Sequence, residues 1–99
     1  MDRRYRRAHV VKLPKNVQLG GHTIPIRRKK LAKYAGYFEP DTLTIVIDSD
    51  ATPSIAWETL YHEIIEAINW LGEYNLPHQT IQQLGVWLHQ AVESMELKQ

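Results

Sequence analysis

The stretch GYFEPDTLTIVID, residues 36–48, decides the fold. After Gly36 it has two aromatic residues, Tyr37 and Phe38. It then passes through the turn-forming Glu39-Pro40-Asp41-Thr42 and ends in a run rich in β-branched side chains. This order predicts a β-hairpin. Successive side chains of a strand point to opposite faces, so Leu43, Ile45 and Ile47 are expected to face the core.

Two shorter strands are expected before this hairpin. The first covers residues 9–13 and stops at Pro14, and the second covers residues 22–27, after a Gly20-Gly21 turn. Pro25 cannot donate a hydrogen bond to a neighbouring strand. We therefore expect the strand at 22–27 to lie at an edge of the sheet.

Two helices are expected after the hairpin. The first has Thr52 as its N-cap and Pro53 as its first residue, and it runs to about Leu71. The second spans roughly residues 77–96. Residues at helical spacing predict the apolar stripe of each helix. The stripes are Ile55, Leu60, Ile64, Ile68 and Leu71 in the first helix, and Ile81, Leu84, Leu88, Val92 and Met95 in the second.

Strands followed by helices indicate an α+β domain. We expect a small, N-terminal antiparallel sheet of three to four strands, packed with the two C-terminal helices. Residues 1–8 are expected to form a basic, flexible arm, and residues 9–99 a single domain. A length of 99 residues with 43% hydrophobic residues fits one small globular domain.

Composition also limits the chemistry and the setting. The chain has no cysteine, so any metal must be held by His, Asp or Glu. There is no apolar run of membrane-spanning length, and no apolar stretch follows the basic N-terminus. We therefore expect a cytoplasmic protein with no membrane partner.

Charge is divided sharply along the chain. Residues 1–33 hold eleven of the twelve basic residues and one acid, whereas residues 34–99 hold ten acids and one lysine. The basic third can face an acidic partner such as nucleic acid. Alternatively, the two halves complement one another within the fold.

The pattern His62-Glu63-x-x-Glu66 lies inside the first predicted helix. Residues four apart share one helix face, so the imidazole of His62 and the carboxylate of Glu66 can hold one cation from the same side. Glu63 projects in a neighbouring direction, from which it can take a proton from a water on that cation. This pattern predicts a divalent-metal site with Glu63 as general base.

A metal ion needs further ligands, and His78 is the best candidate. It begins the second helix, after a short connection that can bring it back towards the first. Glu73 is a weaker candidate at the end of the first helix. His89 lies on nearly the same helix face as His78 but about 16 Å further along the axis, so both cannot bind one ion.

These segments resemble a group of small, mostly phage-encoded zincin-like proteins, some of them described as metallopeptidases. The resemblance covers roughly residues 20–95 and is strongest over residues 58–84, which include the His62 motif and Leu76-Pro77-His78. It implies a minimal zincin-like fold and a peptide or protein substrate in the host cytosol. It also implies His62 and His78 as metal ligands, Glu63 as general base, and Glu66 at the second-ligand position.

Glu66 departs from the family pattern, in which this position is histidine. A carboxylate adds negative charge, which weakens the metal as a Lewis acid. It also widens the choice of metal from zinc towards manganese or iron. The sequence thus favours metal binding over proteolysis.

Two other functions are open from the sequence. The basic residues favour a non-catalytic phage regulatory or nucleic-acid-binding module, although the acidic C-terminal helices argue against helix–turn–helix recognition of DNA. Alternatively, Glu63 with Glu66 and Glu93 with Glu96 could hold Mg²⁺ in an all-helical nucleotide pyrophosphohydrolase. The predicted hairpin argues against that fold.

Overall fold

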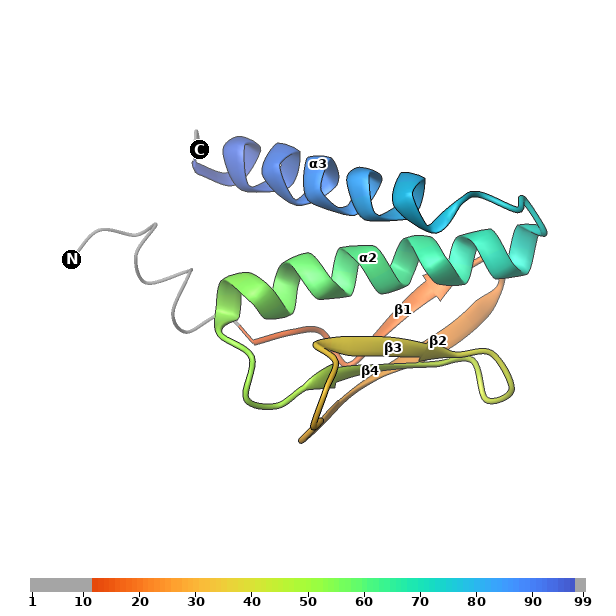
Figure 1. Cartoon of the computed structure of the whole chain (residues 1–99), viewed down its shortest axis with the longest axis horizontal. Helices are drawn as coiled ribbons and strands as arrows, with labels where there is room; N and C mark the ends of the chain where they lie inside the picture. Colours follow the sequence, from red (N-terminus) through yellow and green to blue (C-terminus); the bar gives the residue numbers. More distant parts are fainter. Residues whose placement is uncertain (1–11, 98–99) are drawn as a thin grey trace.

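The computed structural model describes residues 12–97, and the chain forms three layers (Figure 1). A four-stranded sheet is covered on one face by helix α2, and helix α3 lies on the far side of α2. The elements are β1 Asn16–Leu19, β2 His22–Lys29, β3 Gly36–Glu39, β4 Thr44–Asp48, α2 Pro53–Gly72 and α3 His78–Leu97. The predicted α+β class, with an N-terminal sheet and two C-terminal helices, is confirmed.

The predicted hairpin is formed by β3 and β4, which pair antiparallel with Glu39 opposite Thr44. As expected, Ile45 and Ile47 are fully buried beneath α2, and Leu43 packs at the margin of the same core. Leu43 itself has a positive φ of 48° in the loop between the strands. Alternating β-branched residues thus define this half of the sheet.

Strand β1 was not predicted. Val17 and Leu19 alternate with exposed residues, and the strand joins β2 through Gly20 and Gly21, whose φ values of 55° and 86° suit a two-residue hairpin turn. The expected strand at residues 9–13 lies mostly outside the described residues, as does the basic arm at 1–8. Within the described part, Lys12 and Leu13 are not in a strand.

The prediction that Pro25 marks an edge strand was wrong, because β2 lies between β1 and β4. The two halves of β2 pair with different neighbours. Residues 22–25 pair with β1, whereas residues 26–29 pair with β4. The N–H groups of successive strand residues point to opposite sides, and the Ile26 N–H donates to the Lys15 carbonyl on the β1 side. The nitrogen of Pro25 therefore faces the β4 side. Pairing with β4 starts only at Ile26, so no hydrogen bond is lost there.

The sheet is mixed rather than wholly antiparallel, because β2 and β4 run parallel. Strand β3 intervenes between them in sequence but takes the outer position, which gives the order β1-β2-β4-β3. As a result β3 forms one edge of the sheet, and α2 packs against both β3 and β4. This arrangement sets an open strand edge beside the helix that carries the His62 motif.

Helix α2 begins as predicted. The Thr52 hydroxyl accepts a hydrogen bond from the Ile55 N–H at 3.4 Å, and Pro53 occupies the first turn. Its predicted apolar stripe was partly wrong, since Ile55 and Ile68 are exposed. The residues of α2 that are buried are Ala56, Leu60, Glu63, Ile65 and Ala67.

Helix α3 packs on α2 through Ile81, Gly85 and His89, all of which are buried. A Cβ atom at Gly85 would lie only 3.2 Å from the Cα of His62, so glycine lets the two helices approach closely beside the motif. Much of the predicted stripe of α3 is exposed instead, namely Leu84, Leu88 and Met95. Within residues 12–97, neither helix has the length and hydropathy of a membrane-spanning segment.

Candidate metal centre

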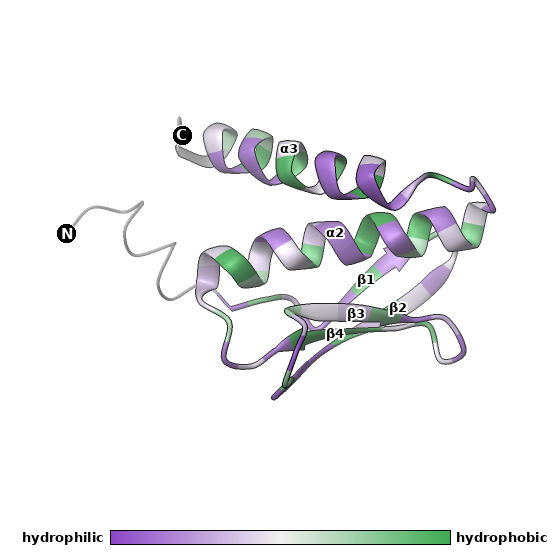
Figure 2. Ribbon diagram, viewed as in Figure 1, coloured by the Kyte–Doolittle hydropathy of each residue, from purple (hydrophilic) through white to green (hydrophobic). Residues whose placement is uncertain are grey.

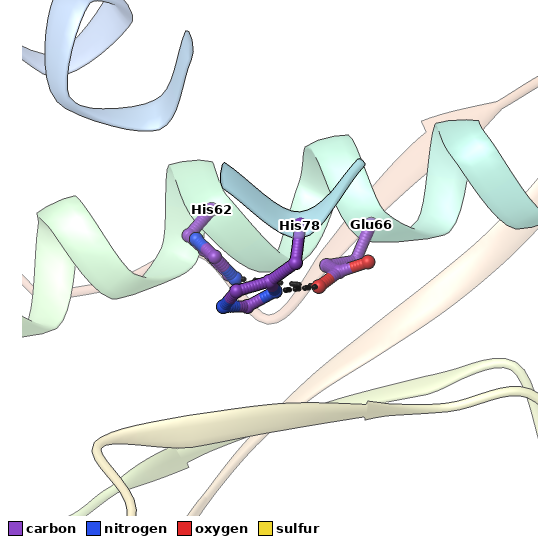
Figure 3. Close-up of side chains that lie close together, drawn as sticks. All are labelled: His62, Glu66 and His78. Atoms are coloured by element: carbon purple, nitrogen blue, oxygen red, sulfur yellow. Dashed lines mark ion pairs between the residues drawn. The ribbon is translucent and has the colours of Figure 1, made fainter. Parts of the chain in front are cut away.

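Three side chains from two helices converge at one point (Figure 3). His62 and Glu66 lie one turn apart on α2, and His78 is the first residue of α3. One donor atom from each side chain can be chosen so that all three lie within 4.8 Å of one another. These three residues can therefore hold a metal ion, and they are the ligands predicted from the sequence.

The two separations that involve Glu66 match those of ligands around a tetrahedral ion. Glu66 Oε2 lies 3.4 Å from His62 Nε2 and 3.5 Å from His78 Nδ1. Metal–ligand bonds of about 2.0–2.2 Å around zinc place tetrahedral donors about 3.3–3.6 Å apart. A direct N–H···O hydrogen bond is shorter, about 2.7–3.2 Å. The spacing of Glu66 from each histidine is therefore compatible with donors that share one ion.

The connection between the helices brings His78 back to α2. Helix α2 ends at Gly72 and is capped by Glu73, which adopts the left-handed conformation. The N–H groups of Glu73 and Tyr74 donate to carbonyls of the last turn. The Asn69 side chain then accepts a hydrogen bond from the Leu76 N–H at 2.8 Å. These bonds fix the loop, so that the imidazoles of His78 and His62 meet edge to face, 5.4 Å between centroids.

Glu63 is the buried carboxylate of the site, with 7% of its surface exposed. Its Oε2 lies 3.9 Å from His62 Nε2, and within the described chain it makes no hydrogen bond. Burial, with a smaller contribution from the Glu66 carboxylate, raises the pKa of Glu63 from 4.5 to about 7. A group with this pKa can exchange protons near neutral pH.

Burying Glu63 is expected to make the metal-free protein less stable as pH rises. The folded state holds the proton up to about pH 7, but the unfolded chain loses it near pH 4.5. The resulting loss in the free energy of unfolding is absent well below pH 4.5 and grows between the two pKa values. It reaches its full size above the pKa of the folded state. Glu63→Gln should therefore raise the free energy of unfolding by about 1 kcal/mol at pH 5 and about 3 kcal/mol at pH 8.5.

Urea denaturation in the presence of a chelator measures this difference. Asp41→Asn, which removes an exposed carboxylate in the β3–β4 turn, is the matched control and should change stability little at either pH. An equal effect of Glu63→Gln at both pH values would show that the carboxyl is not destabilised by burial.

The three candidate metal ligands line a cleft of about 1170 Å³ between the β3 edge and helices α2 and α3. One wall carries aromatic side chains from Tyr34, Tyr37 and Phe38, and Trp70 lies edge to face against Phe38. Four carboxylates line the cleft, and no lysine or arginine does so among the described residues. The carboxylates are Glu58, Glu63, Glu66 and Glu73. The cleft is therefore aromatic and acidic around the candidate metal ligands.

The other two residues considered from the sequence lie away from the ligand group. Glu73 is exposed at the end of α2, lines the cleft, and is not part of the three-residue cluster. His89 is buried further along α3, as its distance along the helix predicted. Neither joins the candidate metal ligands.

A second cluster, centred on His89, was not predicted. His89 Nδ1 lies 3.5 Å from Glu58 Oε1 on α2, and its Nε2 lies 3.3 Å from Glu93 Oε1 without hydrogen-bond geometry. The ring of Tyr61 packs against His89 at 5.7 Å between centroids. The four-residue spacing of His89 and Glu93 in the sequence could have predicted their contact on one helix. The contact of His89 with Glu58 could not be predicted, because it depends on how the two helices pack.

No protein-family model, curated protein or solved structure matches this chain. The resemblance to phage zincin-like proteins stays a prediction.

Proposed function

We propose that the chain is a metal-dependent hydrolase that acts on peptide bonds. The observation that carries this proposal is the convergence of His62, Glu66 and His78 in an open cleft, beside a buried carboxylate whose pKa is about 7. Two histidines and one glutamate are a donor set found in catalytic zinc sites, which leave a fourth position for water or substrate. We therefore favour zinc over manganese or iron.

In the proposed reaction, three residues bind the metal and a fourth transfers a proton. When bound, zinc supplies Lewis-acid polarisation of a carbonyl and acidifies water. His62, Glu66 and His78 would hold the ion, and Glu63 would accept a proton from the attacking water and return it to the leaving amine. Burial keeps Glu63 away from bulk solvent, and its position one residue after His62 keeps its carboxylate next to the ligand atoms.

A peptide suits this cleft better than a phosphate ester. Within residues 12–97, strand β3 pairs on one side only, so its other edge can take an extended peptide by strand addition. Its residues Gly36, Tyr37 and Phe38 line the cleft together with the metal ligands. The carboxylates of the cleft would also repel phosphate groups.

Parallel assays of the zinc-loaded protein test the substrate class. We expect cleavage within a library of quenched fluorescent peptides and no release of phosphate from pyrophosphate or phosphodiester probes. Addition of a chelator should abolish cleavage. A protein that binds zinc but cleaves no peptide in the library would contradict the proposed activity.

Nucleic-acid binding is a second candidate, and one observation favours it. Within the described chain, seven basic residues are exposed and none forms an ion pair with a described carboxylate. These residues are Lys12, Lys15, Arg27, Arg28, Lys29, Lys30 and Lys33. Titration with duplex DNA and with single-stranded RNA at two salt concentrations tests this, because phosphate contacts weaken steeply with salt.

We do not extend the proposal to a nucleotide pyrophosphohydrolase. That hypothesis requires an all-helical fold, whereas this chain has a four-stranded sheet. Glu93, one of the carboxylates it needs, lies beside His89 instead.

A further inference from the structure

Helix α3 carries a second apolar stripe that nothing in the described chain covers. It forms the outer layer of the fold and packs against α2 through Ile81, Gly85 and His89 (Figure 1). The uncovered stripe, called here the outer stripe, consists of Leu84, Trp87, Leu88, Ala91 and Met95. Trp87 and Met95 expose 59% and 57% of their surfaces, and Leu84 and Leu88 expose 38% and 40%.

The outer stripe has the spacing of a helix-pairing surface. Leu84, Leu88, Ala91 and Met95 follow one another at steps of four, three and four residues, which is the heptad pattern of paired helices. At 100° per residue, this stripe is rotated roughly 100° around the axis from the residues that face α2. Figure 2 shows apolar residues along α3 as well as in the sheet. An apolar sector this wide leaves room for a second packing partner beside α2.

We propose that this partner is the α3 helix of a second copy of the chain, packed antiparallel about a twofold axis. The axis would pass between Leu88 and Ala91. Leu84 of each copy would then face Met95 of the other, and Leu88 would face Ala91. Each large side chain at the centre thus meets a small one, so the helices can approach closely, while Trp87 covers the flank of the contact.

Charge favours a second copy over a foreign protein. In residues 78–95 the only Asp, Glu, Lys or Arg is Glu93, and it lies beside His89 rather than on the outer stripe. Two copies can therefore meet here without like-charge repulsion, and a charged partner would find nothing to pair with. The strongly charged surfaces lie elsewhere, in the acidic cleft and the basic strands. Depletion of charge together with exposed Trp and Met is typical of an interface core.

The contact would be of modest size. Trp87 still exposes 59% of its surface and its neighbours expose less area each, so the five residues could together bury on the order of 500 Å² per copy. The total of about 1,000 Å² lies at the low end of biological interfaces, among weak and transient ones. We therefore expect a dimer that dissociates on dilution into the micromolar range.

Sedimentation equilibrium of the full chain tests the proposal. The mass at about 200 µM should be twice the monomer value of 11.6 kDa, and it should fall towards that value on dilution. Leu88→Glu, which buries a carboxylate of each copy against Ala91 of the other and brings the two charges close together at the axis, should leave only monomer. Gln90→Glu adds the same charge on the same helix outside the outer stripe, and it should leave the dimer intact.

A second pair of variants keeps the test valid if Leu88→Glu fails to fold. The natural chain has no cysteine. Ala91→Cys should form a disulfide-linked dimer on mild oxidation, whereas Ser94→Cys, which lies further from the axis, should not. A wild-type chain that is monomeric at about 200 µM would overturn the proposal, as would a dimer that persists in folded Leu88→Glu.

Discussion

Replacing Glu63 by glutamine is expected to slow peptide hydrolysis by the zinc-loaded protein about 10²–10⁴-fold and to leave zinc bound. The amide has nearly the shape of the carboxyl group but cannot accept the proton that the attacking water must lose. Glu63 is not one of the three clustered donors, so its loss should not open the metal site. Initial rates on the best-cleaved library peptide, with zinc measured in the same samples, would establish both results.

Asp41→Asn serves again as the matched acid-to-amide control, because Asp41 is exposed in a turn outside the cleft. Its rate should equal that of the wild type. Full activity in zinc-loaded Glu63→Gln would contradict the role of Glu63 as general base. Loss of zinc in that variant would instead place Glu63 among the ligands.

Replacing His62 by alanine is expected to weaken zinc binding by more than about 100-fold. Loss of a residue that only supports a ligand already costs 10–100-fold, and loss of a ligand should cost more. His62 is also the donor that lies between Glu66 and the buried Glu63, at 3.4 Å and 3.9 Å. Competition with a chromophoric zinc chelator would measure the change.

His22→Ala is the matched control, because His22 is an exposed histidine on β2 away from the ligand cluster. It should bind zinc as the wild type does. Equal affinity in His62→Ala and His22→Ala would mean that zinc binds elsewhere on the chain. His78→Ala should behave like His62→Ala, since the two imidazoles flank the same carboxylate oxygen.

Local sequence signals predicted much of this fold because the relevant interactions are short-ranged. The β3–β4 hairpin follows from turn residues between a β-branched run and an aromatic one. The start of α2 follows from Thr52 and Pro53, and the pairing of His62 with Glu66 follows from helical spacing. Even the approach of His78 could be predicted, since only a short connection separates it from the end of α2.

Features that depend on tertiary packing were not predictable in this way. Pro25 suggested an edge strand, but the sheet accepts it in the interior because β2 changes partner at that point. The apolar stripe of α3 was assigned to the core. In the structure Gly85 and His89 face α2, whereas Leu84, Leu88 and Met95 of that stripe are exposed. Periodicity identifies an apolar face but does not say which neighbour covers it.

The burial of Glu63 also could not be predicted from the sequence. The sequence places this carboxylate next to His62 but does not show that it is buried, and burial is what raises its pKa. The aromatic wall of the cleft arises because β3 ends up at the sheet edge beside α2. The interpretation of Glu66 also changes once His78 is seen beside it. The sequence counted its carboxylate against catalysis, but here it completes a group of two histidines and one glutamate.

A crystal structure of the zinc-soaked protein, with anomalous scattering measured at the zinc edge, tests the central claim most directly. We predict one strong anomalous peak per chain, about 2.0–2.2 Å from His62 Nε2, a Glu66 carboxylate oxygen and a His78 ring nitrogen. Zinc bound only at other residues, or no peak between these three side chains at saturating zinc, would contradict the metal site and the function built on it.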